Sequence, residues 1–265
     1  MLIKDRPSHI VEITSEAQTR LHLCALYRLL AHFKMDDMIY SHASAKIPGE
    51  ETFLINPFGL RFEEVTPQGL IKVDYAGVIE GDATHPANAA GFVIHSAVLS
   101  ARPSIGCVIH THTRAGVAVS SLEEGLLPIN QWAIEFFDRV GYHDYEGLAF
   151  DLDEGPRLQR DLVGKVALIL RNHGLLAVGQ TIPGAFYLMY YLELAVQTQI
   201  DIMASGRKIY MPSPAVIEHT SKQFTSAYDP ASAGHRMWPS LLRLLDREYP
   251  DWKNGFDDAS DHLHR

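Results

Sequence analysis

Hydrophobic residues recur at helical spacing in several stretches of the chain. Ser15 and Glu16, a capping residue followed by an acid, precede apolar residues spaced along Leu21 to Leu30, so we expect a helix to begin at Ser15. Residues 182–204 are apolar almost throughout and carry Pro183 in the first turn, which predicts a long helix. Further helices are expected at 88–101, 114–122 and 238–245.

Continuous apolar runs between the helices predict buried strands at 105–109 and 166–170. Residues 39–55 divide into two short strands around a Pro-Gly turn, and residues 70–73 and 77–79 predict two more. Strands and helices alternate in the middle of the chain, which is typical of an α/β layered domain. The alternation on its own favours parallel strands, because a crossover helix between two strands returns the chain in the same direction.

We find no internal repeat, low-complexity linker or second apolar core in the sequence. With 265 residues, 46% of them apolar, the chain is long enough to bury one large core. We therefore expect one domain over residues 1–265, with its core at about 15–206 and a helical C-terminal extension at 211–265.

Charge and cysteine content narrow the range of partners. The net charge of −9 argues against nucleic acid and against an anionic membrane, since both favour basic surfaces. We find no stretch suited to a signal peptide or long enough to span a bilayer. The cysteines are Cys24 and Cys107, and Cys107 lies in an apolar strand, which fits a reducing cytoplasm better than a disulfide framework. We expect a cytoplasmic protein that binds a small molecule.

Three histidines follow two of the predicted strands. His110 and His112 are two residues apart, so in an extended chain they point to the same side, about 6.6 Å apart. His173 follows the second buried strand. Three histidines at two strand ends favour one divalent metal ion over ordinary strand-end residues, and three nitrogens leave a coordination position open. Imidazole suits zinc first, with manganese, iron and cobalt as alternatives.

Other polar residues are weaker candidates. His95 lies within a predicted helix and is expected to be a core residue or a partner of a metal ligand. His85 lies in a loop with Asp82. It is a candidate for a fourth metal ligand or a base, and the alternative is a solvated loop residue. His143 and Asp144 lie either at the rim of a polar pocket or in a surface turn. The glycine motifs that bind phosphates and dinucleotides and the nucleophile elbow are absent.

At these residues the sequence resembles the class II aldolase/adducin family, over roughly residues 15–206. The resemblance rests on Ser100-Ala-Arg-Pro103, His110-Thr-His112 and Arg171-Asn-His-Gly-Leu175, in this order. Five further segments are closest to the adducin head: Phe53 to Gly59, Glu63 to Val65, Lys72 to Asp74, Ala90 to Phe92, and Tyr142 to Tyr145.

The resemblance implies a central, mainly antiparallel sheet flanked by helices, in place of the parallel pairing that the alternation favours. It also implies that residues matching His110, His112 and His173 hold zinc, which polarises a ketose-type substrate. Family tetramers place their sites between subunits, so we expect a homo-oligomer, a tetramer. The apolar residues 186–194 also favour an oligomer, because their number exceeds the needs of one sheet.

The resemblance also implies roles for residues around the metal. A tyrosine matching Tyr142 would donate the proton, with His85, Asp82 or His143 as substitute bases. The substrate would be bound by the turn from Asn56 to Gly59 and by the segment from Asn88 to Gly91.

Three departures from the family pattern affect the expected chemistry. The aldolase glutamate that transfers a proton falls on Gly91, which has no side chain to do so. The aldolases' Gly-Asn pair is Ser41-His42 here, and their paired serines are Ala89-Ala90, so a phosphate group would lose several hydrogen bonds. Adducin's cytoskeletal role relies on a long basic tail, whereas this sequence carries an acidic stretch at residues 257–261.

Two functions remain open. The first is a metal-dependent carbon-carbon lyase, an aldolase or decarboxylase, acting on a small non-phosphorylated oxo or hydroxy acid. The second is a non-catalytic module like the adducin head, serving oligomerisation or cytoskeletal-type interactions. Gly91 favours the module, whereas the intact set of three histidines favours the lyase.

Overall fold

The computed structural model describes residues 11–81, 85–149, 151–227 and 229–256. Eight strands form one sheet in the spatial order β4-β3-β2-β1-β5-β8-β7-β6. In chain order their bounds are His42–Lys46 (β1), Thr52–Ile55 (β2), Ile71–Asp74 (β3), Ile79–Glu80 (β4), Cys107–Thr111 (β5), Val140–His143 (β6), Ala167–Leu170 (β7) and Gly174–Gly179 (β8).

All neighbouring strands pair antiparallel except β6 and β7, which are parallel. The expected central, mainly antiparallel sheet is therefore confirmed, and the parallel pairing that the alternation favoured is wrong. The physical reason is that β7 and β8 form a hairpin around residues 171–173, and that the connection through α2 (Ala89–Ala101) joins β4 to β5, which are not neighbours in the sheet. Among the described elements, only the connection through α5 (Gly155–Asp161) joins strands that pair in parallel, β6 and β7.

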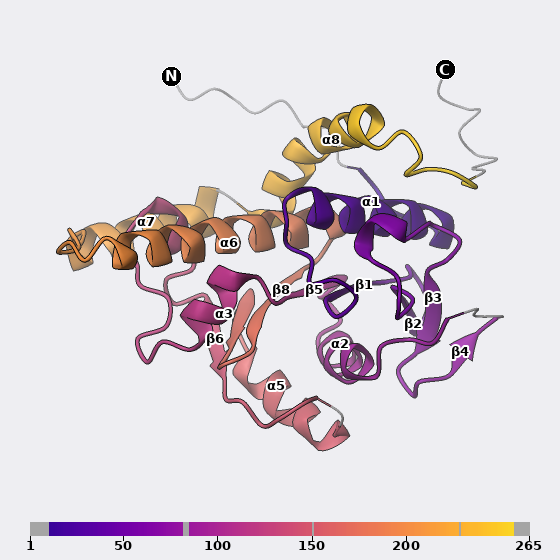
Figure 1. Ribbon diagram of the computed structural model, residues 1–265, viewed down its shortest axis with the longest axis horizontal. Coiled ribbons are helices and arrows are strands. Elements are labelled where there is room, and N and C mark those ends of the chain that lie inside the picture. Colours follow the sequence, from indigo (N-terminus) through magenta and orange to yellow (C-terminus); the bar gives the residue numbers. More distant parts are fainter. Residues whose placement is uncertain (1–10, 82–84, 150, 228, 257–265) are drawn as a thin grey trace.

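Helices cover both faces of the sheet (Figure 1). One face packs against α1 (Glu16–His32), α6 (Ile182–Ala204) and α8 (Pro230–Glu248), and the other against α2 and α5. Strand residues alternate between the two sides, so Ile109 joins the first apolar cluster and Val108 the second. Shorter helices are α3 (Arg114–Ser120), α4 (Gln131–Glu135) and α7 (Pro214–Ala227), with 3-10 turns η1 (Phe62–Glu64) and η2 (Leu152–Glu154).

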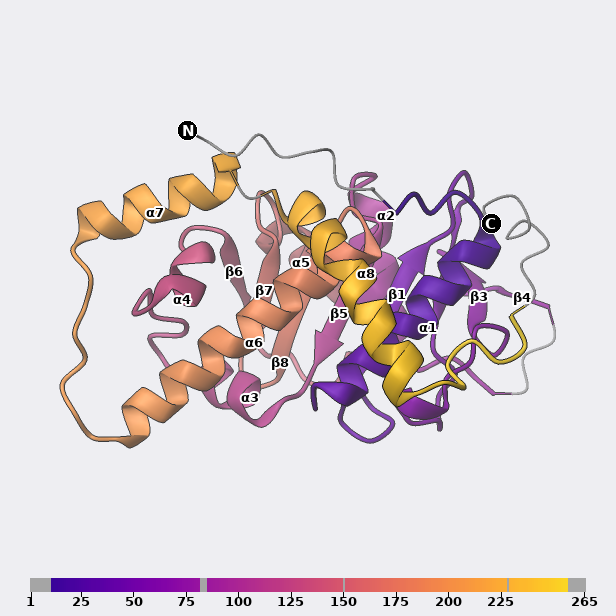
Figure 2. The ribbon, with the colours of Figure 1, turned by 90° about the horizontal axis from the view of Figure 1, so that it is seen from above.

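The helices predicted from Ser15 and at 88–101, 114–122 and 182–204 are present, and α1 begins at its expected cap. Ser15 accepts a hydrogen bond from the backbone of Gln18 at the start of α1, and Asn88 caps α2 in the same way. Beyond Met211, however, the sequence predicted one helix where the structure has two, α7 and α8. Figure 2 shows α8 crossing α6 and α1, with α7 at one margin of the molecule. Trp238 of α8 is fully buried in the first apolar cluster.

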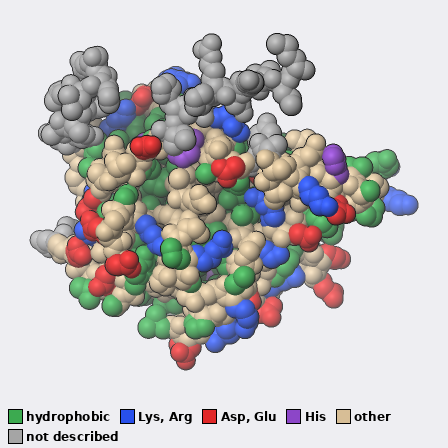
Figure 3. All heavy atoms as spheres, turned by 180° about the vertical axis from the view of Figure 1, so that it is seen from behind, with side chains coloured by type: hydrophobic (Ala, Val, Ile, Leu, Met, Phe, Trp, Pro, Cys, Tyr) green, Lys and Arg blue, Asp and Glu red, His purple; other side chains and the backbone are tan. Residues whose placement is uncertain are grey.

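The surface carries both signs of charge. On the face shown in Figure 3, acidic and basic side chains are interspersed over the surface. Within the described residues, no helix is both long enough and apolar enough to cross a bilayer.

The pairing register brings separate chain segments to one end of the sheet. His42 at the start of β1 lies opposite His110 near the end of β5. Thr111 of β5 pairs with Leu175 of β8, directly after the hairpin that contains His173. Polar residues from three connections therefore meet at this end of the sheet.

Candidate metal centre

The three predicted histidines converge on one point. The Nε2 atom of His110 lies 2.7 Å from Nε2 of His112 and 3.3 Å from Nε2 of His173, and the latter two atoms are 3.0 Å apart. Three nitrogens bound tetrahedrally to zinc would be about 3.3 Å from one another. The side chains are therefore already arranged as a compact set of ligands around a common centre.

Hydrogen bonds on the far side of two rings fix which nitrogen faces the centre. Nδ1 of His110 donates to the carbonyl oxygen of Leu175 over 2.8 Å, and Nδ1 of His112 donates to a carboxylate oxygen of Asp37 over 3.1 Å. A carbonyl and a carboxylate can only accept, so each neutral ring presents an Nε2 lone pair to the other. Such partners orient metal-binding histidines and favour their ligand tautomer.

This arrangement fits a divalent cation. Two lone pairs facing each other at 2.7 Å repel unless a positive charge lies between them. A proton is disfavoured there, because burial holds the pKa of His110 well below its usual range. Burial, followed by the charges of His112 and His143, lowers the pKa of His173 to about 4. A metal ion is the positive charge that suits neutral imidazoles.

A second group of polar side chains lies behind the histidine set. His42 packs against His110 with ring centroids 4.9 Å apart, and its Nδ1 lies 2.8 Å from Nε2 of His95. Nδ1 of His95 is in turn hydrogen-bonded to the hydroxyl of Ser44. All three side chains are buried, which confirms the expectation that His95 is a core residue.

A cavity of about 580 Å³ opens beside the three histidines. Its walls are mostly apolar, including Tyr40, Phe58, Ala89, Ala90, Tyr145 and Leu148. Asp37 and Asn88 contribute polar groups, but no lysine or arginine lines the described part of the cavity. The cavity is therefore suited to a small molecule and offers no protein cation to bind a phosphate.

Comparison with known proteins identifies the family. Residues 21–200 match the model of the class II aldolase and adducin N-terminal domain. This chain belongs to the class II aldolase and adducin family. Mouse alpha-adducin is 44% identical over 248 residues, which span 87% of this chain and 33% of adducin.

Two solved structures extend the likeness. An aldolase II superfamily protein from Pseudomonas syringae has a TM-score of 0.84 and 44% identity, covering 91% of this chain and 97% of its own. L-fuculose 1-phosphate aldolase from Glaciozyma antarctica has a TM-score of 0.75 and 29% identity, covering 88% and 92%. Class II aldolases generally use a divalent metal ion, and the histidine set here could hold one.

The family's proton-transferring glutamate has no counterpart at Gly91, and the structure explains why the position is small. A Cβ atom added to Gly91 would lie 2.9 Å from Cδ2 and 3.0 Å from Cγ of His42. The imidazole of His42 therefore occupies the space into which a side chain at residue 91 would grow.

Tyr142 and His143 lie on opposite faces of β6. The Tyr142 hydroxyl accepts the backbone N–H of Leu126, and the guanidinium of Arg171 lies 4.3 Å from the centre of its ring. Its side chain packs with the first apolar cluster, on the sheet face away from His110. Within one subunit the structure therefore does not bring Tyr142 to the three histidines, and its role as proton donor stays a prediction that depends on a neighbouring subunit.

His143 itself is neither at a pocket rim nor in a surface turn, because its side chain is buried at the end of β6. Its Nδ1 lies 2.8 Å from a carboxylate oxygen of Asp161, and its Nε2 lies 3.2 Å from one of Glu154. Both ring nitrogens are thus engaged, and His143 does not line the cavity beside the metal site. Asp144 is exposed and lines a separate cavity with Arg171 and Asn172.

The remaining predicted site residues are dispersed. His85 is exposed and lines a different cavity with Arg20 and Lys72, and Asp82 lies outside the described residues. Asn56 is buried and accepts a hydrogen bond from the Tyr27 hydroxyl, and neither Asn56 nor Gly59 lines the metal-site cavity. Asn88 lines the cavity while accepting the backbone N–H of Gly91.

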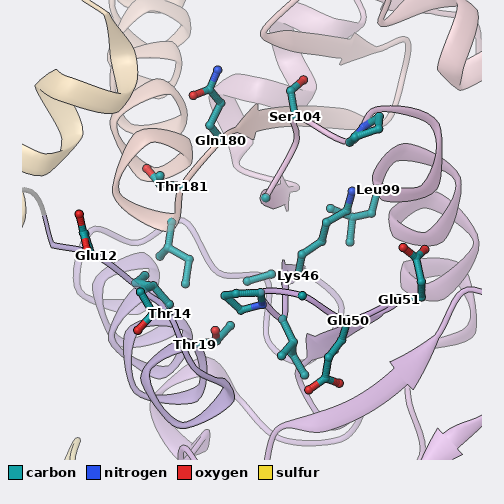
Figure 4. Close-up of a pocket in the computed structure, with 18 of the residues that line it drawn as sticks. Glu12, Thr14, Thr19, Lys46, Glu50, Glu51, Leu99, Ser104, Gln180 and Thr181 are labelled. Carbon is teal, nitrogen blue, oxygen red and sulfur yellow. The ribbon is translucent and has the colours of Figure 1, made fainter.

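Another cavity, of about 730 Å³, lies at the opposite ends of β1 and β5 (Figure 4). Glu12 and Thr14 line it from the segment before α1, and Lys46 and Glu51 line it from the end of β1 and the turn that follows. None of the three metal-site histidines lines it, so it is separate from the candidate metal centre.

Proposed function

We propose that this protein is a metal-dependent carbon-carbon lyase, an aldolase or decarboxylase, acting on a small non-phosphorylated oxo or hydroxy acid. One observation carries the proposal: two Nε2 lone pairs that face each other at 2.7 Å, beside a cavity of about 580 Å³. The likeness to L-fuculose 1-phosphate aldolase supports a lyase. His110, His112 and His173 would hold the ion, for which zinc is the first choice.

Each residue of the set has a distinct part in this function. When bound, the ion would act as a Lewis acid that stabilises negative charge developing on the substrate. Leu175 and Asp37 keep His110 and His112 in the ligand tautomer and orientation. Tyr40, Phe58 and Leu148 present apolar surface, so a bound substrate would displace water from around the reacting atoms.

The charge of the cavity supports a non-phosphorylated substrate. Ala89 and Ala90 lack the hydroxyls of the family's paired serines, and no arginine or lysine takes their place among the described lining residues. A phosphate dianion would be desolvated there without a protein cation. A small oxo or hydroxy acid has less need of a protein cation, because its few oxygens can all bind the metal ion.

We also propose a homo-oligomer, a tetramer, as in the family pattern. Tyr40, Tyr145 and Leu148 at the cavity are 55%, 52% and 73% exposed, which suits cover by a neighbouring subunit. The apolar residues 186–194, which favoured an oligomer in the sequence, do not support one, because Phe186, Met189 and Leu192 of α6 are fully buried within the chain. Light scattering at micromolar concentration should give a multiple of 29.6 kDa, whereas a mass of 29.6 kDa would refute the oligomer.

The experiment begins with the metal content of the purified protein, which we expect to be about one ion per chain. The metal-loaded protein is then assayed against a panel of short 2-oxo, 3-oxo and hydroxy acids, and against fuculose 1-phosphate and ribulose 5-phosphate. We expect turnover of an acid, lost with chelator and restored by zinc. Robust cleavage of either sugar phosphate would show that the substrate class is wrong.

The second candidate function is a non-catalytic module like the adducin head. Two observations favour it: the 44% identity to mouse alpha-adducin and the glycine at the position of the family's glutamate. In that case the metal-loaded protein would turn over no member of the panel, and removal of the metal would change its oligomeric state. Turnover that depends on the metal would exclude this alternative.

A further inference from the structure

A buried chain of hydrogen bonds ends beside the three histidines. It runs from the Ser44 hydroxyl to Nδ1 of His95, and from Nε2 of His95 to Nδ1 of His42 over 2.8 Å. Ser44 and His95 have no exposed surface, and His42 is 2% exposed and lines the cavity. Among the described residues, Nε2 of His42 has no hydrogen-bond partner, so this nitrogen is the open end of the chain.

The direction of this chain follows from its buried end. The Ser44 side chain has one hydrogen-bond partner, Nδ1 of His95, so its hydrogen is satisfied only if the hydroxyl donates to that nitrogen. Burial lowers the pKa of His95 to about 3, and a neutral ring that accepts at Nδ1 carries its hydrogen on Nε2. That hydrogen is donated to Nδ1 of His42, which places the His42 hydrogen on Nε2.

We propose that Ser44 and His95 fix His42 as a neutral Nε2–H donor facing the cavity, where it donates to a substrate oxygen beside the metal site. The proposal deepens the proposed function and rests on it. In this assignment His42 is a catalytic residue that touches the substrate, whereas Ser44 and His95 are positioning residues that act through it.

The space at Gly91 supports the assignment independently. A side chain at residue 91 would collide with the His42 ring, whose Cδ2 would lie 2.9 Å from the added Cβ. The ring is also held against His110, with centroids 4.9 Å apart. His42 therefore supplies the polar group at the place where the aldolase pattern has a glutamate, but as a donor in place of a carboxylate base.

The change from base to donor has a chemical consequence. An N–H donor stabilises negative charge on oxygen without removing a proton from substrate. This suits decarboxylation of a 3-oxo acid, in which the bond to the carboxylate carbon breaks, carbon dioxide leaves and the electron pair moves toward the ketone oxygen. A proton from water then takes the vacated position, and no oxidant or reductant is required.

The first test reads the tautomer directly. Nitrogen NMR of the ¹⁵N-histidine-labelled protein, with and without zinc, should show His42 protonated on Nε2 and unprotonated on Nδ1. Ser44→Ala should abolish this preference, and Ser44→Thr, which keeps the hydroxyl, should retain it. An Nδ1-protonated His42 in the wild-type protein would overturn the proposal, even if zinc binds as expected. Failure to bind zinc would instead refute the proposed function.

The second test measures how much the N–H of His42 contributes to ligand binding. The probe is oxalate, a small dianion that carries carboxylate oxygens as an oxo acid does. We expect His42→Ala to weaken oxalate binding to the zinc-loaded protein about tenfold by calorimetry, the effect of one lost hydrogen bond. Zinc stoichiometry should stay unchanged. His219→Ala, which removes an exposed histidine of α7, should bind oxalate like the wild type. Equal affinity in His42→Ala, or no oxalate binding by the wild type, would overturn the assignment.

Discussion

Two cavities lie at opposite ends of the same two strands, and they differ in how their polar side chains are arranged. His42 begins β1 at the metal-site cavity, and Lys46 ends it at the other. His110 lies near the end of β5, and Gly106 just before its start. The cavity at Lys46 has the larger volume, about 730 Å³ against 580 Å³.

Two charged side chains of the larger cavity have partners in the protein, although Nδ1 of His235 there is buried without one. Lys46 donates to the carbonyl oxygen of Arg102 over 3.4 Å, and Glu50 forms an ion pair of 2.7 Å with Lys72. At the metal site, three Nε2 atoms instead face one another, and the partners of His110 and His112 lie on the far side of the rings. Ligand atoms that converge on one point, and not the volume of a cavity, therefore indicate where chemistry occurs.

The largest expected effect is loss of the metal itself. The double variant His110→Ala, His112→Ala removes two of three ligands, so elemental analysis should fall from about one ion per chain to background. Lys46→Ala with Glu50→Gln, the matched double variant at the other cavity, should retain the wild-type content. Full metal retention in the histidine variant would refute the metal site.

A smaller effect is expected from the partner of His112. Asp37→Asn keeps the size of the side chain but removes its charge, so the ligand tautomer of His112 is less well stabilised. We expect zinc affinity to fall about 10- to 100-fold in competition with a chromophoric chelator. Glu51→Gln at the other cavity makes the same chemical change and should leave the affinity unchanged. An unaltered affinity in Asp37→Asn would mean that this carboxylate does not support the ligand.

Two glycine substitutions, one beside each cavity, are expected to lower stability for different reasons. Gly91→Ala gains helix propensity of about 1 kcal/mol but presses its Cβ against the buried His42 ring, so we expect a net loss of about 1–2 kcal/mol in urea denaturation. A stability equal to or above that of the wild type would show that the His42 ring can shift at little energetic cost.

Gly49 lines the other cavity, and a Cβ there would meet nothing within 4 Å. Its φ of +80° disfavours an L side chain, so Gly49→Ala should cost about 1 kcal/mol through backbone strain alone. Zinc affinity should be unaffected. A change in zinc affinity would indicate that the two ends of β1 are coupled.

Sequence reasoning succeeded where the signal is local. The Ser15 cap, the helix over 182–204 and the strand before His110 each follow from a short pattern of residues. Strand β8 was missed because Leu175 to Val178 follow β7 after only a short polar turn, and that turn was interpreted as part of the site. Strand β6 was missed because glycine and polar residues surround it.

The site residues were likewise predicted only where the signal is local. His110 and His112 share a strand spacing that the sequence displays, whereas the role of His42 depends on its register opposite His110, 68 positions away by residue number. Asp37 gave no signal, because its contact with His112 spans 75 positions of the chain. Tyr40 and Leu148 at the cavity likewise depend on how loops meet, which no local pattern encodes.

The mutual exclusion between residues 42 and 91 has a consequence for how such a site can change over evolution. A glutamate cannot be introduced at 91 while the ring at 42 remains, and removal of that ring first leaves both a void and an unpaired His95. Either single step therefore passes through a less stable protein, so the two positions are epistatic. Conversion between a carboxylate-bearing and an imidazole-bearing site requires paired substitution, and a double-mutant cycle on His42 and Gly91 should reveal that coupling as strong non-additivity.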